Sequence, residues 1–496
     1  MTMLIIISKL INELNSKKIK YVHWKSNEHL NEALNGETDL DLLVDEEDYF
    51  SFLEVMNKLE FKKFKTQPFF DYHSVDDYLG FDENTGKLIH LHVHFKLVIG
   101  KKFVKETHLP FEKKIFETSI IDEYSNLKII NPNLEIILLI IRSISKHQGL
   151  LYRPQNLNNE YIKEYVWLKN RVELKELELF FKYIFQNVPY KFNTKLLMNM
   201  ENKNNLKSLK KYSKTFLKNY RKSSLFSVAF LYYYSNIRVA LKNIIIKRGK
   251  LPYPYKRVHP VTGKIIVFMG VDGSGKSTLL SYTKKWLSKK MDIYPVYFGA
   301  GKGSTSLLRF PFYITKKIFS VSKSKDNNGK TRSNDVNKDK GKKNSNLVKS
   351  VKIIHAIILA NEKKKKFKKI AKAKRNGLIV ISDRFPQNEI SGYNDGPKLQ
   401  HWLNNDNTLK NKIATWEHNI YNMGEKISPD VIIKLEVNKE TAKKRKPETP
   451  TSMIIKKINA VNKIQISKSA SIKKVNTQNS FEITKKEIRN IIKSFI

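Results

Sequence analysis

The fold of the C-terminal half of this chain follows from one stretch of its sequence, Lys264-Ile-Ile-Val-Phe-Met-Gly-Val-Asp-Gly-Ser-Gly-Lys-Ser-Thr-Leu-Leu280. It opens on a short run of apolar residues, which is typical of a strand buried on both faces of a parallel sheet. The pattern Gly270-x-x-x-x-Gly275-Lys276-Ser277 follows and leads into a helical pattern. A strand before the glycines and a helix after them is the context that a phosphate-binding loop requires. We therefore predict a nucleotide-binding P-loop domain.

Each residue type in this loop suits phosphate chemistry. Glycines let the backbone amides close around phosphate oxygens, and the N-terminus of the following helix adds its positive dipole. We expect Lys276 to contact the β- and γ-phosphates of ATP and Ser277 to ligate Mg²⁺, with Thr278 supporting that ligand. The residues predicted to bind the nucleotide are Gly270, Asp272, Gly273, Ser274, Gly275, Lys276, Ser277 and Thr278.

Further strands are predicted after the loop, at residues 294–298, 378–382, 431–437 and 471–475, with helical patterns between them. This alternation predicts an α/β fold with a doubly wound parallel sheet. The strand at 378–382 ends at Asp383-Arg384, so both side chains emerge at the sheet edge where such folds bind ligands. We expect Asp383 to hold Mg²⁺ through water and Arg384 to bind a phosphate. The composition of residues 320–350 predicts a flexible insertion.

The loop resembles that of thymidylate kinases, and so do three segments that follow it. These are Asp383-Arg-Phe385, Pro429-Asp-Val-Ile-Ile-Lys-Leu-Glu-Val437 and Lys439-Glu-Thr-Ala-Lys-Lys-Arg445, and the resemblance covers about residues 263–496. It implies an ATP-dependent phosphotransferase in which Asp272 faces the transfer site and Arg384 faces the acceptor phosphate. It also implies that Arg445, with Lys443 and Lys444, lies in a mobile lid over the transferring phosphoryl group.

Two segments depart from that family. Phe298-Gly-Ala-Gly-Lys-Gly-Ser304 stands where the family has Arg-Glu-Pro-Gly-Gly, and Ser391-Gly-Tyr-Asn-Asp-Gly-Pro397 replaces its Tyr-Gln motif. The acceptor is therefore left open between a nucleoside monophosphate and another phosphorylated small molecule. Because thymidylate kinases are commonly dimers, the resemblance also implies a homodimer.

Two aspartates mark the N-terminal part of the chain. In Gly36-Glu-Thr-Asp39-Leu-Asp41-Leu-Leu-Val44, a strand places Asp39 and Asp41 on one face, where they could share divalent metal ions such as Mg²⁺. An Asp-x-Asp strand after a helix, with an upstream turn at His23-Trp-Lys-Ser26-Asn, resembles nucleotidyltransferases over about 100 residues. The resemblance implies a nucleoside triphosphate held through metal ions.

A third carboxylate is expected on a neighbouring strand of that family, and this chain has His90, His92 and His94 there instead. Their spacing of two places all three imidazoles on one face. Two interpretations stay open. The histidines are metal ligands or general bases, or they are the polar outer positions of a half-exposed strand.

The length of 496 residues exceeds what one hydrophobic core supports. We predict a nucleotidyltransferase-like α+β domain at residues 1–125, a helical subdomain at 126–250, a Pro-rich linker at 251–263 and the kinase-like domain at 264–496. The absence of cysteine excludes thiolate nucleophiles and zinc–thiolate sites. Without a signal-peptide pattern or a long apolar run, we expect a cytoplasmic protein with no membrane span.

The formal net charge of +45 allows two interpretations: a surface that binds nucleic acid, or a chain that is diffusely rich in lysine. The leading functional hypothesis is an ATP-dependent phosphotransferase of the thymidylate kinase type. Two alternatives are a nucleotidyltransferase that acts through Asp39 and Asp41, and a P-loop ATPase coupled to binding of nucleic acid or another partner.

Overall fold

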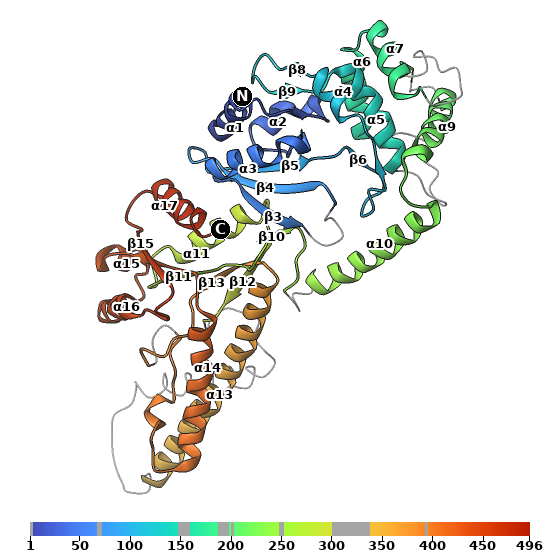
Figure 1. Cartoon of the computed structure of the whole chain (residues 1–496). Coiled ribbons are helices and arrows are strands. Elements are labelled where there is room, and N and C mark those ends of the chain that lie inside the picture. Colours follow the sequence, from blue (N-terminus) through green and yellow to red (C-terminus); the bar gives the residue numbers. More distant parts are fainter. Residues whose placement is uncertain are drawn as a thin grey trace. The chain divides into compact units, whose positions relative to one another are not determined.

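The computed structural model describes residues 3–66, 72–146, 159–186, 198–199, 203–247, 252–299, 338–391 and 395–496 (Figure 1). Contacts divide the chain into two compact units. The N-terminal unit comprises Met1–Lys250, Pro254–Pro260 and Lys289–Asp292, and the C-terminal unit comprises Leu251–Tyr253, Val261–Ser288 and Ile293–Ile496. The chain thus first changes unit within the Pro-rich segment that the sequence marks as a linker. The predicted helical subdomain at 126–250 belongs to the N-terminal unit.

A five-stranded sheet with every neighbouring pair parallel forms the centre of the C-terminal unit. Its order is β12-β13-β11-β14-β15. The bounds are β11 Ile265–Gly270, β12 Ile293–Tyr297, β13 Ile379–Asp383, β14 Val431–Glu436 and β15 Ser471–Asn476. These strands confirm the predicted α/β fold, because each of the five lies within one or two residues of its predicted position. All six residues of the central strand β11 are buried, as its unbroken apolar run requires.

Helices connect the strands of this sheet or, in the case of α17, follow the last strand. They are α11 Lys276–Leu287, α13 Lys338–Arg375, α14 Thr408–Ile427, α15 Lys439–Arg445, α16 Thr451–Lys463 and α17 Phe481–Lys493, with the short η4 Gln400–Trp402. The long helices α13 and α14 lie side by side (Figure 1). Within the predicted flexible insertion, the described backbone from Lys338 onward is helical and forms the first part of α13; lysine is a good helix former. Residues 320–337 lie outside the described part of the chain.

A mixed eight-stranded sheet forms the N-terminal unit, in the order β10-β3-β4-β5-β2-β1-β9-β8. Its strands are β1 Tyr21–His23, β2 Leu40–Val44, β3 Lys62–Thr66, β4 Val75–Phe81, β5 Leu88–His94, β8 Ile120–Ile121, β9 Lys128–Ile129 and β10 Arg257–Val258. A separate two-stranded sheet pairs β6 Val98–Ile99 with β7 Thr107–His108. β4 and β5 form an antiparallel hairpin whose turn begins at Asp82, and the Asp82 side chain accepts a hydrogen bond from the Thr85 amide. β2 runs parallel to β5 and sets Asp41 opposite His92.

Helices of this unit enclose two hydrophobic cores. One core joins β1, β2 and β5 to α1 Ile5–Ser16, α2 Leu30–Leu34 and α3 Tyr49–Lys58. The other joins side chains of β1 and β2 to α4 Glu112–Glu117, α5 Pro132–Lys146, α6 Asn159–Lys169, α7 Leu174–Ile184 and α9 Lys203–Tyr220. Short 3₁₀ helices η1 Asn27–His29 and η2 Glu46–Asp48 also occur, and α10 Leu225–Lys247 follows α9. The helical segment therefore shares a core with the sheet.

Among the described helices, including the 23 residues of α10, none has the combination of length and apolar character that crossing a membrane requires.

Candidate functional site

The glycine loop between β11 and α11 has the conformation that its sequence predicts. Gly273 and Gly275 have φ angles of +87° and +75°, in the left-handed region that glycine adopts without strain. A Cβ atom on Gly273 would lie 2.8 Å from the carbonyl oxygen of Ala442, so no larger residue fits there. Gly275 caps α11, which begins at Lys276. The loop therefore ends at a helix N-terminus, as an anion-binding loop requires.

Lys276 folds back over this loop. Its side chain is buried, and its Nζ donates to the carbonyl oxygen of Gly270 at 3.4 Å. Burial lowers the pKa of Lys276 and Arg384 lowers it further, whereas Asp383 and Asp272 oppose the shift. The ammonium group thus lies among the charged residues that the sequence assigns to the site. Ser277 and Thr278 follow in the first turn of α11, and both are exposed.

Asp383 and Arg384 lie at the carboxyl end of β13, as predicted. The Arg384 amide donates to the carbonyl oxygen of Phe268 at 3.0 Å, which ties this segment to the end of β11. Arg384 has a φ angle of +66°, a conformation that non-glycine residues rarely adopt. The Asp383 Oδ1 atom is buried and has no hydrogen-bond partner among the described residues. Burial raises the pKa of Asp383, although Lys276 and Arg384 act in the opposite direction.

The Asp272 carboxylate in the loop has two cationic neighbours. The guanidinium of Arg384 lies 3.6 Å from it, and the Nζ of Lys457 lies 2.5 Å from it. Burial acts to raise the pKa of Asp272, but the hydrogen-bonded ion pair with Lys457 outweighs it and the pKa is lowered. Lys457, which lies in α16, is a residue of the site that the sequence does not predict. In a chain with 92 Lys and Arg residues, nothing in the local pattern distinguishes it.

Arg445, at the end of α15, contacts the loop directly. Its guanidinium donates to the carbonyl oxygens of Gly273, at 3.2 Å, and Thr477, at 3.0 Å. Lys443 donates instead to the carbonyl oxygens of Pro447 and Thr449. Of the three basic residues assigned to a lid by resemblance, Arg445 is therefore the one for which the described structure records a bond to the phosphate loop. Lys444 is exposed.

A buried polar network holds the segment after β13 that departs from the thymidylate kinase pattern. Buried Glu417 of α14 accepts hydrogen bonds from the amides of Lys398 and Leu399. Lys363 donates to the carbonyl oxygen of Asp395, at 2.9 Å, and burial lowers the pKa of Lys363 to about 8. The Asp395 carboxylate lies 3.9 Å from Arg384. Asp395 is thus a further charged residue of the site that was not predicted.

Two parts of the predicted site lie outside the described residues. They are residues 300–304 of the first departing segment and residues 392–394 of the second. Beside the loop there is a cavity of about 250 Å³ at the carboxyl ends of β14 and β15. Its lining includes Val271, Glu436, Asn438, Ile458, Asn476 and Gln478.

The N-terminal unit holds a second group of charged side chains, in which the two predicted metal-binding aspartates have different partners. The Asp39 carboxylate lies 2.9 Å from His90 Nδ1 and 2.8 Å from Lys290 Nζ. His90 also forms a short hydrogen bond with buried Asp77. Burial acts to raise the pKa of Asp39, but His90 and Lys290 together hold it well below its usual range. Asp39 therefore already has cationic and imidazole partners.

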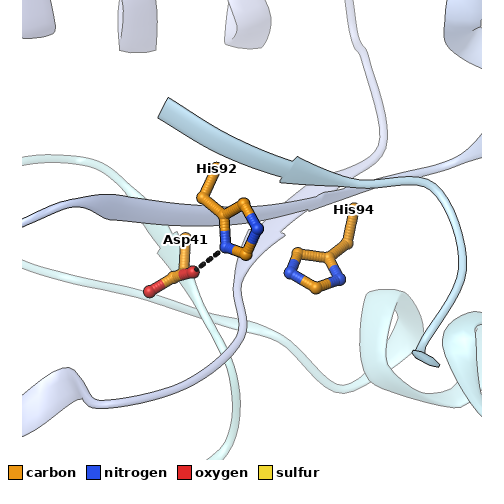
Figure 2. Close-up of side chains that lie close together, drawn as sticks. All are labelled: Asp41, His92 and His94. Atoms are coloured by element: carbon orange, nitrogen blue, oxygen red, sulfur yellow. Dashed lines mark hydrogen bonds and ion pairs between the residues drawn. The ribbon is translucent and has the colours of Figure 1, made fainter. Parts of the chain in front are cut away.

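Asp41 instead lies with His92 and His94 (Figure 2). Its Oδ1 is 2.9 Å from His92 Nδ1 and 2.8 Å from Lys25 Nζ. Burial lowers the pKa of His94 well below its usual value, and the neighbouring His92 and Lys25 act in the same direction. The structure therefore places two of the three predicted histidines beside Asp41 and the third beside Asp39.

No protein-family model matches the chain. The chain is 28% identical over 206 residues to the uncharacterized ATP-binding protein YghR of Escherichia coli (strain K12), a match that covers 40% of this chain and 75% of YghR. It is 25% identical over 205 residues to the uncharacterized ATP-binding protein YghS of the same strain, covering 39% of this chain and 78% of YghS.

Among solved structures, thymidylate kinase from Ehrlichia chaffeensis matches with 14% identity and a TM-score of 0.24, over 46% of this chain and 98% of that one. Thymidylate kinase from Candida albicans matches with 16% identity and a TM-score of 0.27, over 47% of this chain and 92% of that one. Each of these similarities therefore concerns less than half of the chain.

Proposed function

We propose that the C-terminal unit binds ATP with Mg²⁺ and transfers the γ-phosphate to a phosphorylated small molecule, such as a nucleoside monophosphate. The observation that carries this proposal is the grouping of the glycine loop, Lys276, Asp383 and Arg384 at one edge of a parallel sheet. Ligands of open α/β sheets bind at the carboxyl ends of the strands, and both segments follow such ends.

The donor side of this proposal rests on the loop. Its glycines leave room for phosphate oxygens near the backbone, and Lys276 supplies a cation. The curated names of YghR and YghS, both ATP-binding proteins, agree with a nucleoside triphosphate as the donor. The cavity beside Val271 offers amide side chains such as those of Asn476 and Gln478, which suit the edge of a base.

Ser277 and Asp383 are the residues that would hold Mg²⁺. The ion would neutralise charge on the β- and γ-phosphates. Ser277 is exposed in the first turn of α11, next to Lys276. The buried Asp383 Oδ1, without a partner among the described residues, fits this role because a nearby cation offsets the cost of ionising a buried carboxyl.

Cations around the loop favour phosphoryl transfer to an acceptor over simple hydrolysis. Arg384 lies between the carboxylates of Asp272 and Asp395, which orient its guanidinium before substrate arrives. Arg445 and Lys457 approach the loop from α15 and α16. Phosphoryl transfer depends chiefly on positioning and on neutralising developing charge, and this arrangement supplies both.

The test is ADP release by the full-length protein with ATP and Mg²⁺, on a panel of nucleoside monophosphates and sugar phosphates. Lys276→Met removes the loop ammonium, and Lys285→Met changes an exposed lysine of the same helix as the matched control. We expect at least one acceptor to raise ADP release in the wild type and the Lys285 variant, and none to do so in the Lys276 variant. If no acceptor raises turnover above the level of the Lys276 variant, the phosphotransferase proposal is wrong.

A further inference from the structure

We propose that Asp41, His92 and His94 of the N-terminal unit form a binding site for one divalent transition-metal ion. Asp41 lies in β2 and the two histidines in the adjacent strand β5. The parallel register sets Asp41 opposite His92, and the spacing of two places His94 on the same face. One oxygen or nitrogen atom of each residue lies within 4.8 Å of the others (Figure 2).

The strongest support comes from the surroundings of His94. Its side chain is fully buried, at 0% exposure, and neither ring nitrogen has a hydrogen-bond partner within the described part of the chain. The ring instead packs edge-on against Trp24, at 5.0 Å between centroids, and against His92, at 4.6 Å. An imidazole placed without partners loses its hydration and gains no bond in return. A metal ion between His94, His92 and Asp41 would supply the missing partner.

The ligand set indicates which class of ion would bind. Two imidazoles and one carboxylate suit Zn²⁺ and related transition-metal ions, whereas Mg²⁺ prefers oxygen ligands throughout. Ligand atoms that share one such ion are roughly 3–4 Å apart, given metal–ligand bonds of about 2.0–2.2 Å. Closing the site from its observed spacing therefore needs only small side-chain movements. The side chains of His92 and Asp41 are 25% and 16% exposed, which gives an ion access from solvent.

The same geometry separates this site from the pair of aspartates that the sequence suggests. Asp39 is already bonded to His90 and Lys290, which offset its charge. Within the described part of the chain, the ammonium group that forms an ion pair with Asp41 is that of Lys25, at 2.8 Å. A metal ion would compete with this ammonium group for the carboxylate, since both carry positive charge. Removing the charge of Lys25 should therefore strengthen metal binding.

The experiment uses the full-length, metal-free protein without an affinity tag, titrated with Zn²⁺ by calorimetry and with Co²⁺ by visible absorption. We expect one ion per chain bound more tightly than at other positions, and no competition from excess Mg²⁺. Asp41→Asn and His92→Gln should each weaken Zn²⁺ binding at least tenfold, and Lys25→Met should strengthen it. His108→Gln, which changes a histidine paired with Glu112 elsewhere in this unit, is the matched control.

His94→Phe gives a second, independent check, because it keeps an aromatic ring against Trp24 and removes both buried nitrogens. We expect this variant to fold with a thermal midpoint at or above that of the metal-free wild type, and to lose the stabilisation that Zn²⁺ gives the wild type. Should it fail to fold, the partly exposed His92 carries the test. Zn²⁺ binding that is equally tight in the wild type, Asp41→Asn and His92→Gln would overturn the proposal, as would the absence of stoichiometric binding.

Discussion

Replacing Lys457 with methionine removes one ammonium group from the edge of the phosphate loop and keeps most of the side-chain volume. The Nζ of Lys457 lies 2.5 Å from the Asp272 carboxylate, but the two side chains are 29% and 37% exposed. Water therefore screens the ion pair, and its contribution to the free energy of unfolding should not exceed ~1 kcal/mol. If Lys457 serves only this pair, its loss should barely change either the free energy of unfolding or the rate of ADP release.

A role in phosphoryl transfer predicts a much larger effect on rate. An ammonium about 4 Å from a developing charge interacts with it by about 4 kcal/mol at an effective dielectric constant of about 20. Only the part of this interaction energy that is gained between the ground state and the transition state accelerates the reaction. We therefore expect kcat of Lys457→Met to fall roughly 10- to 100-fold, which corresponds to about 1.4–2.7 kcal/mol.

The assay is steady-state ADP release with the acceptor that gives the highest turnover, alongside thermal unfolding of each variant. Lys456→Met, at the exposed neighbouring position of α16, controls for the loss of one positive charge from the same helix. We expect the Lys456 variant to retain the wild-type kcat. A wild-type kcat in Lys457→Met, with unchanged stability, would refute the assignment of Lys457 to the transfer site.

Three further outcomes are expected. Gly273→Ala puts a residue with a Cβ atom in a left-handed backbone conformation and brings that atom against the Ala442 carbonyl oxygen. The free energy of unfolding, measured by thermal unfolding, should fall by ~1–2 kcal/mol, and ATP should no longer stabilise the variant. Glu417→Gln weakens the buried acceptor of two backbone amides, so the free energy of unfolding measured with denaturant should fall by ~1–3 kcal/mol. Wild-type stability of this variant would contradict that role of Glu417. Burial raises the pKa of Glu135 to about 7 from an ordinary 4.5, so the folded state retains a proton that the unfolded state has lost. This contribution to stability is full below pH 4.5, falls as pH rises toward about 7, and amounts to roughly 3 kcal/mol; Glu135→Gln should flatten the pH dependence of unfolding over that window.

The sequence predicts best those features of the site that depend on neighbouring residues in the chain. The strand at Ile265–Gly270, the glycine turn and the helix from Lys276 follow from local apolar patterning and from the φ angles that glycine permits. Asp383 and Arg384 were also predictable, because a buried parallel strand must deliver its next residues to the sheet edge. Each of these inferences needs only a short window of sequence.

Lys457 and Asp395 depend on tertiary structure and were not predictable in the same way. Lys457 reaches Asp272 across 185 positions, and the identity of the bonding lysine follows from how α16 packs beside the loop. Asp395 lies near Arg384 because Lys363 and Glu417, from two other helices, fix the backbone after β13. Many other lysines of the chain have equally lysine-rich sequence neighbours, so the charge pattern alone does not identify the lysine that bonds Asp272.

The partners of Asp39 and Asp41 likewise depend on tertiary structure, although the two aspartates are only two positions apart in the sequence. Alternation along a strand predicts that both carboxylates point to one side, and a shared metal site follows only if neither has another partner. The sheet order brings β5 beside β2, so each aspartate has its own imidazole, His90 for Asp39 and His92 for Asp41. Lys290 also forms an ion pair with Asp39. Two metal ions bound between the aspartates would therefore have to displace both partners of Asp39, His90 and Lys290. A single ion at Asp41 displaces one partner, Lys25, because His92, the other residue bonded to Asp41, would itself become a ligand. The N-terminal unit is therefore better suited to one transition-metal ion than to the magnesium pair that its Asp-x-Asp pattern suggests.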